Sequence, residues 1–190
     1  MSKGGGYEIK ICRKLTEWVT GKQKPEIFWR SGGSGAQATA AYKRGDPSHM
    51  GGDIMAVDKD GVFFTLLFSV EAKNRKSFSL NLSHLIKGTK AGDKHTSSAF
   101  SWWEKTVVDA ERWDKTPLFI FKSNFTPDFI MYPPVVRSMM VDWFGAEPDT
   151  RLVYGGVGSI VLLDSFLELV DPKVLRDNTE EIRKCLKVSS

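Results

Sequence analysis

The sequence predicts an α/β fold in which helices flank a mixed central sheet. An amphipathic helix opens the chain, short apolar segments separated by turn residues follow it, and a second amphipathic helix precedes one more apolar segment. The order helix, three strands, helix and strand is typical of a sheet covered by helices. The length of 190 residues, 41% of them apolar, predicts a single domain spanning 1–190 with a sizeable core.

The first helix is predicted over residues 6–20. Ile11, Leu15 and Trp18 recur at helical spacing and form one apolar stripe. Glu8 falls inside that stripe, and a carboxylate on the core-facing side of a helix needs a partner. The alternative interpretation is that Glu8, close to the start of the helix, only interacts favourably with the helix dipole.

Three strands are predicted after this helix. The first lies in 27–36, where the letters IFWR run into a Gly/Ser-rich loop. The other two lie in 51–73, on either side of a turn signal at 58–61. We therefore expect these two strands to be neighbours joined by a reversal of the chain.

The second half of the chain supplies the remaining elements. A helix is predicted over 101–113, with Ser101 and Glu104 as its capping box. The letters PLFIF at 117–121 predict a short strand in the interior of the sheet. A hairpin is predicted at 152–163 and a final polar helix at 178–187.

The stretch SVEAKNRK carries a glutamate and a lysine two residues apart on a predicted strand. Glu71 and Lys73 therefore share one face, which by itself is most simply an ion pair on an exposed strand. Asp53, however, begins the preceding strand, and Glu8 faces inward from the first helix. Such carboxylates can hold Mg²⁺, and the lysine can position or deprotonate a water and offset phosphate charge. The constellation predicts phosphodiester cleavage.

Positive charge is concentrated in the first half of the chain. Residues 1–95 hold 16 Lys/Arg and 9 Asp/Glu, whereas residues 96–190 hold 11 and 14. This asymmetry favours a polyanionic partner such as nucleic acid, and the alternative is a mildly basic domain without such a partner. The candidate phosphate contacts are Lys3, Lys10, Arg13, Arg30, Lys43, Arg44, Arg75 and Lys76.

These residues resemble the metal-binding signature of PD-(D/E)XK nucleases, with Asp53 followed by the letters EAK at 71–73. The resemblance is closer still to archaeal-type Holliday junction resolvases and their viral relatives. Those proteins open with a basic Gly-rich stretch that runs into a helix with an early glutamate, as SKGGGYEIKICRKL does here, and they continue with a stretch similar to WRSGGSG. The resemblance covers roughly residues 2–122.

The resemblance implies a restriction-endonuclease-like αβββαβ core and an endonuclease that depends on Mg²⁺, with Mn²⁺ as the alternative metal. It implies Glu8, Asp53, Glu71 and Lys73 as the catalytic residues, the three carboxylates among them being metal ligands. It also implies Arg30 and Ser34 as DNA contacts at the rim of the site. The implied partners are DNA, branched in the resolvases, and a second copy of the chain in a homodimer.

Two features depart from the pattern of this family. Gly52, and not proline, precedes Asp53. A tight turn at 58–61 would place Asp53 opposite Leu66, about 16 Å along the strand from Glu71. A shared site therefore requires a wide connection between the strands, over residues 58–66. The insertion at 37–51 is also longer than expected for a resolvase.

Two alternatives to a resolvase follow from the same residues. One is a PD-(D/E)XK nuclease for another branched, nicked or duplex DNA, and the other is a nucleic-acid-binding module that does not cut. The complete set of three carboxylates and a lysine argues against the second. Because there are only two cysteines, without metal-ligand spacing, and no long apolar run, we expect a cytoplasmic protein, in the host cytoplasm if viral, without a membrane partner.

Overall fold

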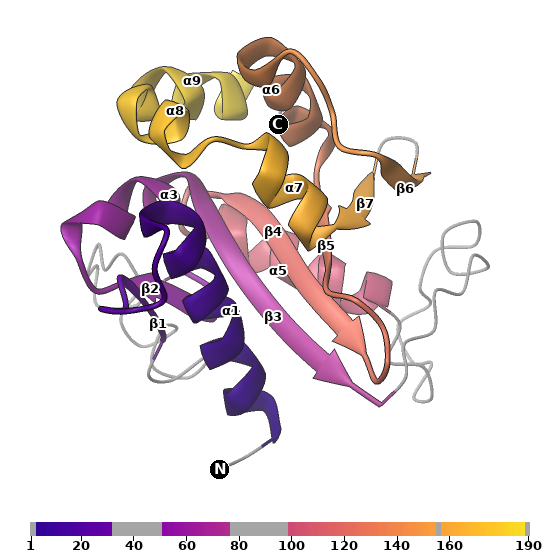
Figure 1. Cartoon of the computed structure of the whole chain (residues 1–190). Coiled ribbons are helices and arrows are strands. Elements are labelled where there is room, and N and C mark those ends of the chain that lie inside the picture. The colour runs from indigo at the N-terminus through magenta and orange to yellow at the C-terminus, as the bar shows by residue number, and fades with distance from the viewer. Residues whose placement is uncertain (1–2, 32–50, 77–98, 155–156, 189–190) are drawn as a thin grey trace.

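The computed structural model describes residues 3–31, 51–76, 99–154 and 157–188 (Figure 1). The elements are α1 (Lys3–Thr20), β1 (Phe28–Arg30), β2 (Ile54–Ala56), η1 (Lys59–Gly61), α3 (Val62–Leu67), β3 (Phe68–Arg75), α5 (Ala99–Glu111), β4 (Thr116–Ser123), β5 (Phe129–Tyr132), α6 (Pro134–Phe144), β6 (Thr150–Tyr154), β7 (Gly158–Leu162), α7 (Leu163–Leu169), α8 (Pro172–Asp177) and α9 (Thr179–Val188). This order confirms the predicted α/β class.

The main sheet of the described chain has five strands in the order β3-β4-β5-β7-β6. β3 and β4 run parallel, whereas the other neighbouring pairs are antiparallel, so the sheet is mixed as predicted. Parallel neighbours need a crossover connection, and α5, which precedes β4, packs against both strands. The predicted hairpin at 152–163 is confirmed as β6 and β7.

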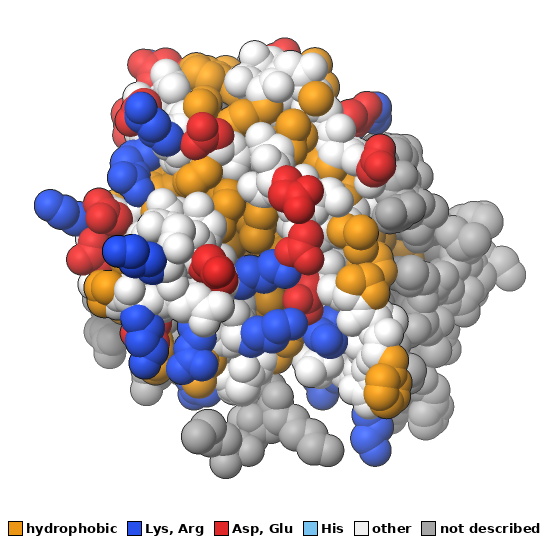
Figure 2. Space-filling view, viewed as in Figure 1, with side chains coloured by type: hydrophobic (Ala, Val, Ile, Leu, Met, Phe, Trp, Pro, Cys, Tyr) orange, Lys and Arg blue, Asp and Glu red, His pale blue; other side chains and the backbone are white. Residues whose placement is uncertain are grey.

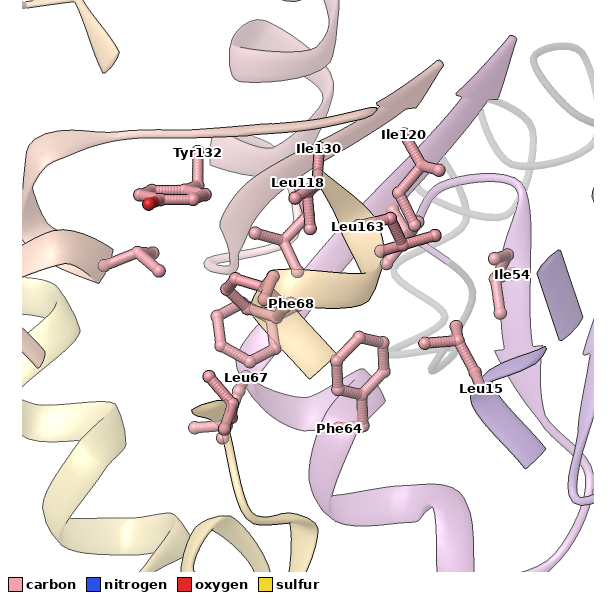
Figure 3. Packing of buried hydrophobic residues seen from close by; sticks show 14 of the residues in the cluster. Leu15, Ile54, Phe64, Leu67, Phe68, Leu118, Ile120, Ile130, Tyr132 and Leu163 are labelled. Atoms are coloured by element: carbon pink, nitrogen blue, oxygen red, sulfur yellow. The ribbon is translucent and has the colours of Figure 1, made fainter. Parts of the chain in front are cut away.

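Helices cover both faces of this sheet (Figure 1). α1 lies in front of β3 in that view, and α5 lies behind β4. On the α1 side, apolar residues of α1, α3, β3, β4, β5 and α7 point toward one another, as Figure 3 shows. On the α5 side a smaller cluster joins Phe100 and Trp103 of α5 to Phe119 and Phe121 of β4. β3 is therefore packed on both faces while it forms one edge of the main sheet.

The predicted reversal between residues 51 and 73 is wrong in its form. The first strand is β2, but the second begins only at Phe68, and the segment between them holds η1 and the helix α3. β2 pairs with β1 in a separate antiparallel ribbon, and the segment just before β2 forms an isolated parallel bridge to β3, between Gly52 and Val70. The connection is wide, as a shared site requires, but the two strands do not form an antiparallel pair.

Two helix starts also differ from prediction. α1 begins at Lys3, three residues earlier than expected, and includes the glycines of the N-terminal stretch. α5 begins at Ala99, two residues before Ser101, so Ser101 lies within the helix and is not its N-cap. α5 is nonetheless amphipathic as predicted, because Phe100, Trp103 and Ala110 are buried on one face.

Among the described residues, the helices are all too short or too polar to span a lipid bilayer.

Candidate active site

Backbone contacts hold Asp53 beside β3. Its amide donates to the carbonyl of Val70 (2.7 Å), and its carbonyl accepts from the amide of Ser31 (2.9 Å). The side chain is only 1% exposed, and its Oδ2 accepts from the amide of Ala72 (3.0 Å). A buried carboxylate is costly unless it is hydrogen-bonded or paired, so these contacts direct the Asp53 carboxylate at the E-x-K segment of β3.

The position before Asp53 explains the departure from the family pattern. Gly52 has a φ of 86°, in the left-handed region, whereas proline is restricted to a φ near −65°. A Cβ atom at Gly52 would also lie 2.4 Å from the carbonyl oxygen of Val70. The hydroxyl of Ser31 donates to the Gly52 carbonyl (2.8 Å) and holds the segment in place. This close approach to β3 is what brings Asp53 to its neighbours.

The Lys73 ammonium lies between the carboxylates of Asp53 and Glu71. Its Nζ donates to Oδ2 of Asp53 (3.1 Å) and forms an ion pair with Oε1 of Glu71. The side chains of Lys73 and Glu71 are 26% and 16% exposed, so the group is mostly covered but still accessible to solvent. The shared strand face predicted for Glu71 and Lys73 therefore meets the Asp53 carboxylate.

Glu8 approaches the same group from α1. Its side chain is 19% exposed, and Oε2 lies 4.0 Å from Nη1 of Arg30 at the end of β1. It is close enough to Asp53 and Lys73 for their charges to influence its ionisation. All four predicted catalytic residues thus gather where α1, the segment before β2, and β3 meet, with Arg30 beside them.

The ionisable side chains of this group shift one another's pKa values. Burial and the Asp53 charge raise the pKa of Glu8 above its usual value, against the opposing effects of Lys73 and Arg30. The same two causes raise the pKa of Glu71, although Lys73 opposes them. Burial would lower the pKa of Lys73, but the two carboxylates outweigh it and raise that pKa, so Nζ is an ammonium at neutral pH.

Cys12, one helical turn after Glu8, takes no charged part in the site. Burial, together with the Glu8 charge, raises the pKa of its thiol to about 12. A thiol must lose its proton to act as a nucleophile or metal ligand. Cys12 is therefore an apolar packing residue behind the carboxylates.

Comparison with protein families connects this arrangement to a known group. Residues 1–154 of the chain match the family described as "Phage putative PDDEXK endonuclease". The chain belongs to this family. The match covers α1, both small strands, β3, α5 and β4, which carry or support the four site residues. Comparisons with curated proteins and with solved structures give no significant match.

Family membership supports a nuclease with DNA as its substrate, and the mixed sheet flanked by helices is consistent with a restriction-endonuclease-like fold. PD-(D/E)XK nucleases generally use divalent metals. The donor chemistry here fits such an ion, because carboxylate oxygens are the ligands that hard divalent cations prefer. The crowding of negative charge that raises the pKa of Glu8 and Glu71 would also be relieved by a cation.

The arrangement of the described residues does not yet form a closed metal site. No three acidic, histidine or cysteine side chains among them are grouped as metal ligands. The Lys73 ammonium instead bridges Asp53 and Glu71. A divalent cation would therefore compete with the Lys73 ammonium for the same carboxylate oxygens of Asp53 and Glu71.

The predicted phosphate contacts fall into several groups. Arg30 lies beside Glu8, and Arg75 and Lys76 are exposed at the end of β3. Arg13 pairs with Glu26 (3.8 Å), and Lys10 pairs with Asp128 (2.9 Å). The remaining predictions are not described: Ser34, Lys43 and Arg44 lie outside the described residues, as does the side chain of Lys3.

Figure 2 shows Lys and Arg side chains gathered over the lower part of one face, where α1 and the end of β3 lie in Figure 1. Asp and Glu side chains border them. Part of this positive charge is neutralised, because Lys14 pairs with Asp164 and both Lys10 and Lys14 approach Asp128. The free positive charge is therefore smaller than the sequence count suggests.

The structure adds residues of α5 that the sequence did not bring to the site. The charge of Lys105 lowers the pKa of Glu71, against the larger effects of burial and Asp53. The Arg75 guanidinium lies over the ring of Trp102, 4.8 Å from its centroid. Trp102 and Lys105 are three residues apart, so they share a helix face. This spacing is the feature of the sequence from which their common approach to β3 could have been inferred.

Proposed function

We propose that the protein is a Mg²⁺-dependent endodeoxyribonuclease that acts on branched DNA, most specifically a Holliday junction resolvase working as a homodimer. The observation that supports this proposal most directly is the Lys73 ammonium between the Asp53 and Glu71 carboxylates, with Glu8 beside them. Two symmetric copies of one active site suit two symmetric cuts in a four-way junction. The family supports the nuclease, and the resemblance of the N-terminal segments supports the resolvase.

The residues of the chain divide the chemistry between them. Glu8, Asp53 and Glu71 supply oxygen ligands, and a divalent ion bound there would polarise the phosphate and lower the pKa of a bound water. Lys73 is held as a cation, so we assign it to offsetting charge on the scissile phosphate and to positioning the attacking water. Arg30, beside Glu8, is in position to contact a phosphate next to the cut.

We further propose that the protein acts in the cytoplasm, in the host cytoplasm if it is phage-encoded, as the family description suggests. Both cysteines are unpaired, Cys12 buried and Cys185 exposed. An exposed free thiol suits a reducing compartment.

The test is a cleavage assay on a panel of four-way junction, flap, nicked, single-stranded and duplex DNAs with Mg²⁺ or Mn²⁺. We expect paired nicks in the junction with either ion and none with EDTA. Asp53→Asn and Glu71→Gln should remove detectable cleavage because each loses a charged ligand. Lys73→Met should lower the rate by about 10²–10³-fold through lost charge stabilisation.

Asp164→Asn is the matched control. Asp164 is also a carboxylate that pairs with a lysine, but it lies on α7 and its side chain is 66% exposed. This variant should cut at the wild-type rate. Cleavage by Glu71→Gln at the wild-type rate would show that the active site is elsewhere, and sedimentation as a monomer with no preference for junctions would leave only the broader nuclease.

A further inference from the structure

Phe125 is not packed into the core formed by the described residues. It lies in the turn between β4 and β5, and its side chain is fully exposed, with a relative accessibility of 104%. The next most exposed large apolar side chain among the described residues is Val57, at 52%. A wholly solvated aromatic ring contributes nothing to the free energy of unfolding through burial.

The backbone at Phe125 is also unfavourable. Its φ is 64°, in the left-handed region that bulky side chains rarely adopt. Residues held in such conformations persist where the surrounding structure over-determines them, and they occur preferentially at functional sites. The turn therefore carries a conformational cost for which the described fold gains no contact.

The turn itself is well braced. The amide of Thr126 donates to the carbonyl of Ser123 (3.3 Å), and the amide of Ser123 donates to Oγ1 of Thr126 (3.0 Å). Asp128, three residues after Phe125, is buried and accepts hydrogen bonds from Tyr7 and Lys10 of α1. The ring is thus presented on a rigid support, and not on a loose loop.

The β4–β5 turn lies at the C-terminal ends of β3 and β4, beyond the level of Lys73. β3 and β4 are in parallel register, with Lys73 opposite Phe121 and Arg75 opposite Ser123. At strand rise, the tip of the turn is about 10 Å beyond the level of Lys73, or about three nucleotide steps. Figure 1 shows the β4–β5 turn beside the C-terminal end of β3.

Positive charge surrounds this end of the sheet. Arg75 and Lys76 are exposed at the end of β3, and Lys122 is half-exposed on β4 immediately before the turn. Such a cluster of positively charged side chains suits a polyanion, and a nucleic acid backbone is one. An exposed aromatic ring next to phosphate-binding side chains is the combination that stacks on bases.

We propose that Phe125 stacks on the face of a DNA base where the stack of the duplex is interrupted. Bases within a continuous duplex are covered on both faces, whereas a junction, nick or flap exposes one. Phe125 would then select interrupted DNA, while Arg75, Lys76 and Lys122 hold the adjacent phosphates. This inference rests on the proposed nuclease function and gives it a residue that distinguishes substrates.

The test compares Phe125→Asn with Phe125→Trp. Asparagine adopts the left-handed region more readily than other side chains except glycine, so Phe125→Asn should keep the turn, with a melting temperature equal to or above that of the wild type. Affinities for a four-way junction and for duplex of the same sequence are measured with Ca²⁺ in place of Mg²⁺. We expect junction affinity to fall about 5- to 150-fold, equivalent to about 1–3 kcal/mol, with duplex affinity unchanged.

Phe125→Trp should retain junction affinity, because the larger ring stacks as well. Val141→Asn, an exposed apolar side chain on α6, is the control and should bind both DNAs as the wild type does. A 2-aminopurine at the junction branch reports the stacking directly, through a fluorescence change that Phe125→Asn should lose.

Equal losses on junction and duplex, or no loss on either, would overturn the role of Phe125. A shift of Phe125→Asn from dimer to monomer in sedimentation would make the ring a contact between two copies instead, which also overturns it. A wild-type chain that binds and cuts DNA while Phe125→Asn binds normally refutes only this inference. A wild-type chain that binds neither DNA refutes the nuclease proposal as well.

Discussion

At the residue scale, the site brings three carboxylates close together, and the Lys73 ammonium compensates part of their negative charge. Asp53 is nearly inaccessible, and the ionised forms of Glu8 and Glu71 are disfavoured by burial and by the Asp53 charge. Lys73 is the cation that bridges two of these carboxylates. Removing one partner of a buried pair leaves an uncompensated charge, so substitutions here test stability together with activity.

Gly52 is the residue whose backbone places Asp53, and it yields a prediction about stability. Gly52→Ala must adopt a left-handed conformation and must also move its Cβ away from the Val70 carbonyl oxygen, 2.4 Å distant. The first cost is about 1–2 kcal/mol and the second, which shifts backbone, about 1–3 kcal/mol. We expect a loss of about 2–5 kcal/mol in the free energy of unfolding, measured by urea denaturation, and a large loss of cleavage.

Gly145 provides a matched control for this substitution. Its φ is 71°, but nothing lies within 4 Å of the position that a Cβ would occupy. Gly145→Ala should therefore show only the left-handed cost of about 1–2 kcal/mol and should cut DNA normally. If both substitutions cost the same, the close approach of Gly52 to β3 does not hold Asp53 in place.

At the element scale, α1 is fixed to the sheet by a buried carboxylate. Asp128, just before β5, is 6% exposed at its side chain and accepts from Tyr7 (3.1 Å) and from Lys10 (2.9 Å). Burial alone would raise the pKa of Asp128, but the hydrogen bond and charge of Lys10, with smaller effects of Tyr7 and Lys14, lower it below the usual value. Since α1 carries Glu8, this contact also orients the site.

The lowered pKa of Asp128 predicts how stability depends on pH. A carboxyl whose pKa is lower in the folded state stabilises the fold above the unfolded pKa, near 3.9, and loses this contribution as pH falls through the folded value. Asp128→Asn should therefore cost about 1.5–3 kcal/mol at pH 7, with the difference from the wild type shrinking below about pH 4. Chemical denaturation of both proteins between pH 2 and 7 measures it.

The exposed Asp164, which also pairs with Lys14, is the control for this prediction. Exposed ion pairs contribute about 0–1 kcal/mol, so Asp164→Asn should cost little at any pH. A deficit of Asp128→Asn that stays constant from pH 7 to pH 2 would mean that the lost contribution is packing and not charge.

The sequence predicted the elements unevenly, for identifiable reasons. α1, the buried face of α5, β4 and the β6–β7 hairpin follow from local periodicity and turn residues. The run VFFTLLF at 62–68 is continuously apolar, and such a run does not distinguish a strand from a buried helix. Its first six residues form α3, which buries Phe63, Phe64 and Leu67 in the main core cluster. The Phe64 ring packs there against Trp18 of α1, with their centroids 5.7 Å apart. That choice depends on contacts distant in sequence.

The same distinction applies to the site. Glu71 and Lys73 could be placed on one face from strand alternation alone. Glu8 could be placed from its position in the apolar stripe of the first helix, and Asp53 from its position at the start of a predicted strand. The parallel bridge that brings Gly52 to Val70 could not be predicted, because it depends on the separate ribbon of β1 and β2. The approach of Lys105 likewise depends on how α5 crosses the sheet.

At the scale of the whole molecule, the excess of positive charge in the first half is partly neutralised by acidic residues of the second half. The side chains of α1 illustrate this, since Lys10 and Lys14 are paired with Asp128 and Asp164. Arg75 and Lys76, by contrast, are exposed at the end of β3 and form no ion pair with a described carboxylate. We therefore expect the DNA backbone to follow the β3 end of the molecule and not the α1–β5 side.

This distribution predicts which lysine determines the salt dependence of DNA binding. Each phosphate contact contributes about −0.9 to the slope of log affinity against log salt for duplex DNA. Lys76→Gln should make the slope less steep by about 0.9, whereas Lys10→Gln should leave it unchanged, because Lys10 would have to give up Asp128 to reach a phosphate. Titrations between 50 and about 200 mM salt with Ca²⁺ measure both slopes.

The two outcomes locate the DNA on the surface. If Lys10→Gln flattens the slope and Lys76→Gln does not, the backbone follows α1, and the charge pairs with Asp128 and Asp164 must open on binding. In that case affinity would carry the cost of breaking those pairs, and Asp128→Asn would tighten DNA binding by releasing Lys10. If only Lys76→Gln flattens it, the phosphates lie at the end of β3, within reach of both Lys73 and the β4–β5 turn.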